Sequence, residues 1–150
     1  PRGHTGGMRV YIPATIDELA LQTSGQWEPG RAYAVTDQLR DEAPDFDEDE
    51  LVEAAIDAAA MTSGLELGSR VRVVIAADVS RADAAPDPAT HPAAVTLVGR
   101  LETASVACVF LDEDDVEADV AAARDGDEEA YDRLAERTLL WYDLREVLPA

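Results

Sequence analysis

The stretch RVRVVIAADV, residues 70–79, decides the fold class. Its first four positions alternate arginine with valine, and the next four are apolar without interruption. A half-buried strand alternates in polarity, whereas a strand that is covered on both faces is apolar at successive positions. The pattern therefore predicts a central β-strand that is covered on both of its faces.

Five other stretches indicate strands. Residues 8–12 alternate, with Val10 and Ile12 expected on one face of the sheet and Tyr11 on the other, and Pro13 is expected to end this strand. Three prolines within residues 81–93 predict a loop. The remaining strand stretches are 32–35, 95–98, 106–111 and 139–142.

Two capping boxes mark the starts of helices. Thr15 and Glu18 predict a helix over residues 16–23, and Asp47 and Glu50 predict a longer helix. In a capping box the side chains of both residues satisfy backbone N–H groups that have no partner within the helix.

The longer helix carries two further signals. Phe46 and Leu51 are spaced as a hydrophobic staple, and Gly64 is expected to end the helix in the left-handed conformation. Single aspartates are expected to cap three later helices, namely Asp112, Asp127 and Asp143.

The order of these stretches is β-α-β-α-α-β-β-β-α-α-β-α. It predicts an α+β or α/β fold: a single domain with a mixed sheet of five or six strands and helices packed on one or both faces. Residues 8–150 are expected to form this one globular domain. Residues 1–7, PRGHTGG, show no periodicity and are expected to be a leader or expression remnant.

The charged residues exclude several chemistries. All 12 basic side chains are arginine, and with 32 acidic side chains the net charge is -20. Without lysine there is no Walker-type phosphate loop and no Schiff base, and we expect no cofactor. Because a negative surface repels phosphate groups, we expect no nucleic-acid partner and no membrane partner. No signal peptide or long apolar span is present, which favours a cytoplasmic protein.

Catalytic and metal-binding patterns are absent from the sequence. His91 has no histidine or cysteine nearby and is expected to be an exposed loop residue. Asp45 begins an aspartate pattern that matches part of a calcium loop, but Glu50 stands where glycine is required. The single cysteine, Cys108, is expected to be a buried, inert thiol. We therefore predict no metal site and name no catalytic residue.

One candidate site depends on strand direction. If the strands that start near Met8, Arg70 and Leu139 are parallel, then Thr15, Asp78 and Asp143 lie just beyond their carboxyl ends, where open sheets bind ligands. Helix capping and strand ending are the competing roles of these residues.

The neighbouring pair Trp141 and Tyr142 is the other candidate for contact with a ligand or partner. It lies inside an apolar stretch, which favours packing in the core, and a surface that stacks on a ligand is the alternative.

Five segments carry a family resemblance: MRVYIPAT, YAVTDQLR, RVVIAADV, SVACVFLD and LLWYDL. Together, and in this order, they resemble an uncharacterised actinobacterial family of small acidic proteins, a domain of unknown function. The resemblance covers residues 8–148 and implies one compact α and β domain in an actinobacterial cytosol. It implies no activity and no site. Similar members have a histidine in the strand that matches SVACVFLD, where this chain has Cys108.

Three functional hypotheses follow. The first is a non-catalytic cytosolic domain that binds another protein, one with a basic surface, and a homo-oligomer is compatible with it. The alternative is a small-molecule-binding protein or small enzyme that uses carboxylates and arginines at the carboxyl ends of strands. The third is a nucleic-acid mimic, for which the acids would have to be spaced like phosphates.

Overall fold

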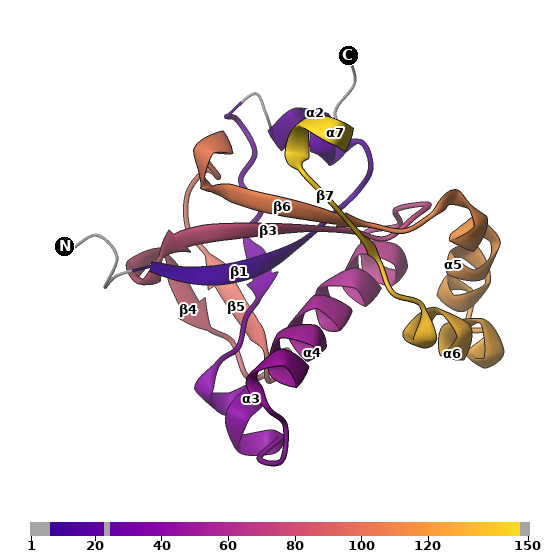
Figure 1. Cartoon of the computed structure of the whole chain (residues 1–150), viewed down its shortest axis with the longest axis horizontal. Helices are drawn as coiled ribbons and strands as arrows, with labels where there is room; N and C mark the ends of the chain where they lie inside the picture. The colour runs from indigo at the N-terminus through magenta and orange to yellow at the C-terminus, as the bar shows by residue number, and fades with distance from the viewer. Residues whose placement is uncertain (1–6, 23–24, 148–150) are drawn as a thin grey trace.

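The predicted central strand is β3, Val73–Ser80, which lies in a seven-stranded sheet of order β4-β5-β2-β1-β3-β6-β7 (Figure 1). The computed structural model describes residues 7–22 and 25–147. The strand pairs among these residues are all antiparallel. The α+β class is confirmed. The other strands are β1 (Gly7–Ala14), β2 (Arg31–Tyr33), β4 (Ala84–Pro86), β5 (Ala94–Leu97), β6 (Val106–Leu111) and β7 (Leu140–Tyr142).

Helices cover both faces of the sheet, as the apolar β3 predicts. Helix α4, the longest helix, contacts β1, β2 and β3 on one face. Figure 1 shows α5 and α6 beyond one end of β3 and β6, and α2 beside α7 at another side of the sheet. The helices are α2 (Glu18–Gln22), α3 (Asp37–Glu42), α4 (Glu48–Met61), α5 (Glu117–Arg124), α6 (Glu128–Glu136) and α7 (Leu144–Val147).

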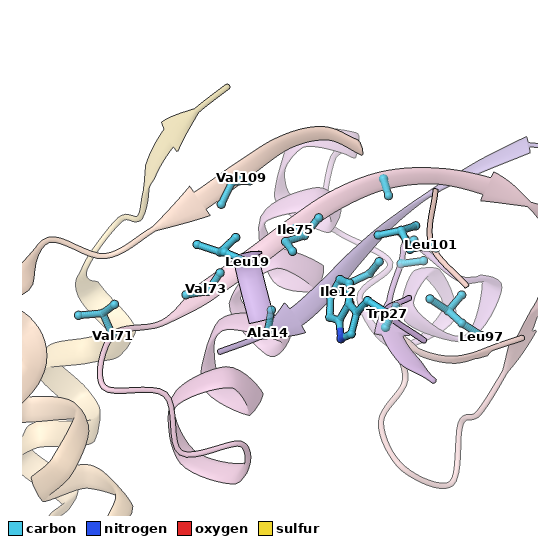
Figure 2. Packing of buried hydrophobic residues seen from close by; sticks show 14 of the residues in the cluster. Ile12, Ala14, Leu19, Trp27, Val71, Val73, Ile75, Leu97, Leu101 and Val109 are labelled. Atoms are coloured by element: carbon cyan, nitrogen blue, oxygen red, sulfur yellow. The ribbon is translucent and has the colours of Figure 1, made fainter. Parts of the chain in front are cut away.

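Each face of the sheet has its own apolar cluster. Val10 and Ile12 of β1 contribute to the cluster shown in part in Figure 2, together with Trp27 and Ile75. Tyr11 points to the other face and joins the cluster beneath α4. The alternation predicted for residues 8–12 is confirmed.

The strands differ from the prediction at two places. Within the predicted loop, Ala84–Pro86 pairs with β5 and adds a seventh strand at one edge of the sheet. Pro13 lies inside β1, opposite Val74, and does not end it. A proline is tolerated there because β2 pairs with β1 only at Tyr11, so no neighbour on that side needs an amide at position 13.

The predicted capping boxes are confirmed. The Thr15 hydroxyl accepts from the Glu18 amide at 3.2 Å, and the Glu18 carboxylate accepts from the Thr15 amide at 2.9 Å. Asp47 and Glu50 do the same at the start of α4, at 2.9 and 3.0 Å. The staple partner Phe46 remains 46% exposed. Helix α2 is shorter than predicted, and Thr23, like residues 1–6, lies outside the described residues.

The end of α4 also differs from the prediction. Gly64 is not left-handed but lies within a π-helical turn, Thr62–Glu66, and the first glycine after this turn, Gly68, has a positive φ of 77°. Single π-helical turns occur frequently at functional sites. The turn is held in place by Ser63, which donates to the carbonyl of Ala14 at 2.6 Å, and by Arg124, which donates to the carbonyl of Gly64 at 2.9 Å.

Within the described part of the chain, no helix combines the length and the hydrophobicity that crossing a bilayer requires.

Candidate functional site

A pocket of about 530 Å³ opens beside helix α4 and its π-helical turn. Helix α6 forms another side of it through Tyr131, and the loop before β5 contributes His91. Tyr33 of β2 and Arg72, just before β3, also line it, as do the carboxylates of Asp57 and Glu66. Its volume lies within the range of roughly 300–1,000 Å³ that is usual for small-molecule sites.

Arg72 is a buried cation at this pocket, with 2% of its surface exposed. Its Nε and Nη2 atoms donate to the two carboxylate oxygens of Asp112 at 2.7 and 2.9 Å, and Nη1 donates to the carbonyl of Leu134 at 3.1 Å. The Arg72 amide also donates to Asp112, at 2.9 Å. Asp112 is therefore the counterion of Arg72. The prediction that it caps a helix is wrong, because Asp112 lies apart from α5, which follows a 3₁₀ turn, Asp114–Val116.

His91 lines the pocket and is partly buried. The prediction that it is an exposed loop residue is therefore wrong. Its ring stands edge-on to Tyr33, with 5.6 Å between the centroids. Its Nδ1 accepts a hydrogen bond from the Ala93 amide at 3.0 Å. Nε2 therefore carries the hydrogen of the neutral ring, and it donates to no other described residue.

Tyr33 is fixed from its other end. Its hydroxyl lies 2.6 Å from the Thr62 hydroxyl, which donates to the carbonyl of Ala58 at 2.9 Å. Because the Thr62 hydrogen is used in that bond, Tyr33 is the donor to Thr62. The π-helical turn thus positions an aromatic ring of the pocket.

Asp57 of α4 is the pocket carboxylate without a counterion. Glu66 forms an ion pair with Arg31 at 3.0 Å, whereas Asp57 makes no hydrogen bond or ion pair with the described residues. Asp57 is accessible to solvent, but partial burial by the surrounding protein raises the pKa of its carboxyl, and the charge of Glu53 raises this pKa further. The charge of Arg72 opposes both effects.

A second hollow, of about 330 Å³, adjoins the pocket. It shares Asp57 and Ala135 with the pocket, and Phe110 of β6 and Arg137 also line it. The Arg137 guanidinium is paired with Asp115 at 2.7 Å. Asp57 of α4 therefore lines both hollows.

Nearly the whole sequence of this chain matches a known family. The sequence profile of a family of unknown function, DUF6912, matches residues 8–149. The chain belongs to this family. No curated protein and no solved structure matches the chain. The pocket of this DUF6912 chain must therefore be interpreted from its own geometry.

Two of the three residues predicted to share a site in this DUF6912 chain, Thr15 and Asp78, lie at opposite ends of their strand pair. Strands β1 and β3 are antiparallel, so Thr15 follows the end of β1 that lies beside the start of β3, and Asp78 lies near the opposite end. The premise that all three strands are parallel is wrong for β1, whereas β3 and β7, which are both antiparallel to β6, run in the same direction. Asp78 instead forms an ion pair with Arg9, with Nε–Oδ1 and Nη2–Oδ2 distances of 2.7 and 3.1 Å.

Asp143 has the capping role that competed with a ligand site. Its carboxylate accepts from the Arg145 amide at 3.0 Å, and its own amide donates to Glu146 at 2.8 Å. The bond from the Arg145 backbone is the main cause of a lowered pKa at Asp143. Asp127 likewise caps α6, as predicted, by accepting from the Glu129 and Ala130 amides at 3.0 and 3.1 Å.

Trp141 and Tyr142 lie in β7, at the edge of the sheet. Trp141 is 61% exposed, so the predicted packing in the core is wrong for this residue, and Tyr142 is partly buried. The edge position explains the difference, because β7 has a neighbouring strand on one side only. Cys108 is buried, as predicted, and burial is the main cause of its raised thiol pKa.

The pocket residues gave weak signals in the sequence. Arg72 alternates with valines exactly as a surface residue of a strand does, and Asp57 belongs to an unbroken helical pattern. No group of three or more potential metal-binding side chains forms within residues 7–22 and 25–147.

Proposed function

We propose that this protein binds a small molecule in the pocket beside α4. The observation that carries the proposal is Asp57, a carboxylate without a counterion in a cavity of ligand size. A group whose pKa is raised by its surroundings and which has no structural partner is a candidate for function. The small-molecule hypothesis thus moves from the strand ends to a different place in the fold.

The other lining residues support this proposal. Tyr33 and Arg72 are held by several hydrogen bonds, so their positions exist before a ligand arrives. His91 offers Nε2 as a donor, and Tyr131 offers an aromatic ring that is 44% exposed. A site with a few fixed polar groups and aromatic surface is typical of ligand pockets. A small enzyme that uses the same pocket stays a prediction.

A fragment screen tests the proposal. The ¹H–¹⁵N NMR spectrum is recorded with a set of small polar and aromatic fragments, and binding is expected to shift the amide signals of α4, His91 and Tyr131. Ala58→Trp, which fills the pocket from α4, is expected to abolish these shifts. Exposed Ala121→Trp on α5 is the matched control. Shifts that persist in Ala58→Trp, or no shifts with any fragment, would contradict a ligand site here.

The edge strand β7 supports a second candidate function, the binding of another protein. Leu140 and Trp141 are 41% and 61% exposed in a strand whose outer side is unpaired in the sheet order. Such an edge can accept a strand from a partner, and a partner with a basic surface would complement the net charge of -20. Sedimentation of the wild type and of Trp141→Ser tests whether this edge also pairs two copies of the chain.

We also propose a cytoplasmic location in an actinobacterium. The single buried cysteine and the acid excess support the cytoplasmic location. The actinobacterial setting is supported by the family resemblance of the five sequence segments.

A further inference from the structure

The charges around the pocket narrow the class of ligand, and this step rests on the proposed function. An anion needs a cation with free donors. Arg72 is the arginine of the described lining, and three of its five side-chain N–H groups already donate to Asp112 and Leu134. Its charge is matched by Asp112 at 2.7 Å. Among the described lining residues, the pocket therefore has no arginine with an unpaired charge to bind a phosphate or carboxylate.

In contrast to Arg72, Asp57 is a charged residue of the pocket without a counterion among the described residues. A ligand that fills the pocket removes water from this carboxylate, and the loss of hydration is costly unless a new donor or a positive charge replaces the water. The pairing of Glu66 with Arg31 leaves Asp57 as the pocket carboxylate that awaits such a group. Glu53 on the same helix strengthens the negative potential.

The aromatic side chains fit the same ligand. The face of a tyrosine ring attracts cations, and Tyr131 lies exposed at the pocket. The net charge of -20 raises the local concentration of cations and lowers that of anions at the whole surface. Neutral apolar molecules gain from neither effect.

From these observations we infer that the pocket binds a small organic cation, an amine or guanidine on an apolar or aromatic body, with the charged group against Asp57. The face of Tyr131 would also attract the charged group, and a hydrogen-bond acceptor on the body of the ligand would meet Nε2 of His91. The binding involves no covalent step.

Three probes of one shape test the inference. Phenethylamine, 2-phenylethanol and phenylacetate carry a cationic, a neutral and an anionic end on the same ring. Their affinities are measured by NMR titration at constant ionic strength, with the shifts of α4, His91 and Tyr131 as the readout. We expect phenethylamine to bind at least tenfold more tightly than either other probe.

Two variants test whether Asp57 makes the pocket selective for cations. Asp57→Asn keeps the shape and removes the charge, and it is expected to weaken phenethylamine by tenfold or more while leaving 2-phenylethanol unchanged. Asp41→Asn, at an exposed position of α3, removes the same charge outside the pocket and is expected to change neither affinity.

Each outcome decides between the two proposals. Equal binding of the three probes in the pocket, or tighter binding of phenylacetate, overturns the inferred cation selectivity and leaves a small-molecule site. Failure of all three probes to shift the pocket signals overturns the inference, and the fragment screen then decides on the site itself. Because the wild type alone gives the selectivity, the test does not depend on the folding of Asp57→Asn.

Discussion

At the scale of single residues, Asp57 and Asp112 are two carboxylates near Arg72 with opposite consequences for stability. Asp112 is buried and fully engaged with Arg72, whereas Asp57 has no counterion. The first is expected to stabilise the folded state and the second to destabilise it at neutral pH.

Asp112→Ala is expected to lower the free energy of unfolding by about 3–5 kcal/mol, because it leaves the buried Arg72 charge without a partner. Denaturant midpoints measure this loss. Asp119→Ala breaks an exposed pair with Arg133 and is the control, which is expected to change the midpoint little. Equal effects of the two variants would show that burial does not distinguish the pairs.

Asp57→Asn is expected to raise the melting temperature at pH 7. A carboxyl whose pKa is raised in the folded state favours folding when it is protonated, and this contribution is lost as the pH rises through the folded pKa. The advantage of asparagine therefore exists at neutral pH and disappears below about pH 3.9, the ordinary pKa of aspartate. The charges that act on the Asp57 carboxyl are those of Glu53 and Arg72. Glu66 and His91 line the same pocket, and Asp49, Glu136 and Arg137 line the adjoining hollow.

Melting curves of both proteins across this pH range measure the difference. A melting temperature of Asp57→Asn that is lower than that of the wild type at pH 7 would mean that the attraction to Arg72 outweighs burial and the repulsion from Glu53. The proposed ligand would then be unnecessary as a counterion.

At the scale of elements, the π-helical turn depends on the small size of Gly64. A Cβ atom at this position would lie 3.1 Å from Cγ of Arg72 and 3.2 Å from Cγ1 of Val120. Arg72 cannot move away easily, because its guanidinium is held by Asp112 and Leu134. The turn is thus packed directly against the buried ion pair.

Gly64→Ala is therefore expected to destabilise the protein by about 1–3 kcal/mol, the usual cost of overpacking a core. Unfolding in urea measures it. Combination with Val120→Ala makes room for the new methyl group, so the double variant is expected to lose less than the sum of the single losses. Additive losses would show that Gly64 is not limited by space.

The elements also show what the sequence could predict. Capping boxes at Thr15 and Asp47 were predictable because both partners lie within four residues of each other. The role of Asp112 was not, since its partner Arg72 is 40 residues away in the chain. The same limit applies to the site: Asp57, His91 and Tyr131 come from three distant segments, and only the folded sheet brings them to one pocket.

At the scale of the whole molecule, 32 acidic and 12 basic side chains leave a large excess of negative charge. Many of the arginines make surface ion pairs, for example Arg40 with Glu48 at 2.9 Å, which salt weakens. The unpaired acids outnumber these pairs, so their mutual repulsion dominates the response to salt.

We expect the melting temperature to rise as monovalent salt increases from low to moderate concentration, over which the Debye length falls to ~8–10 Å. Melting curves in sodium chloride and potassium chloride measure the rise, and equal effects of the two salts exclude specific ion binding. A melting temperature that falls with salt would show that the ion pairs stabilise the fold more than the excess charge destabilises it.

The pairing of β1 with β3 has a consequence for biosynthesis. Strand β1 is synthesised well before β3, yet it pairs with β3 from Gly7 opposite Ser80 to Ala14 opposite Val73. Until β3 has been made, the apolar residues of β1 have neither their main partner strand nor a complete core. Contacts between segments so far apart in the chain slow folding, because a long loop must close before they form. Between the synthesis of β1 and that of β3, the nascent chain must therefore carry an exposed, aggregation-prone strand, which makes β1 the segment that a chaperone would be expected to protect.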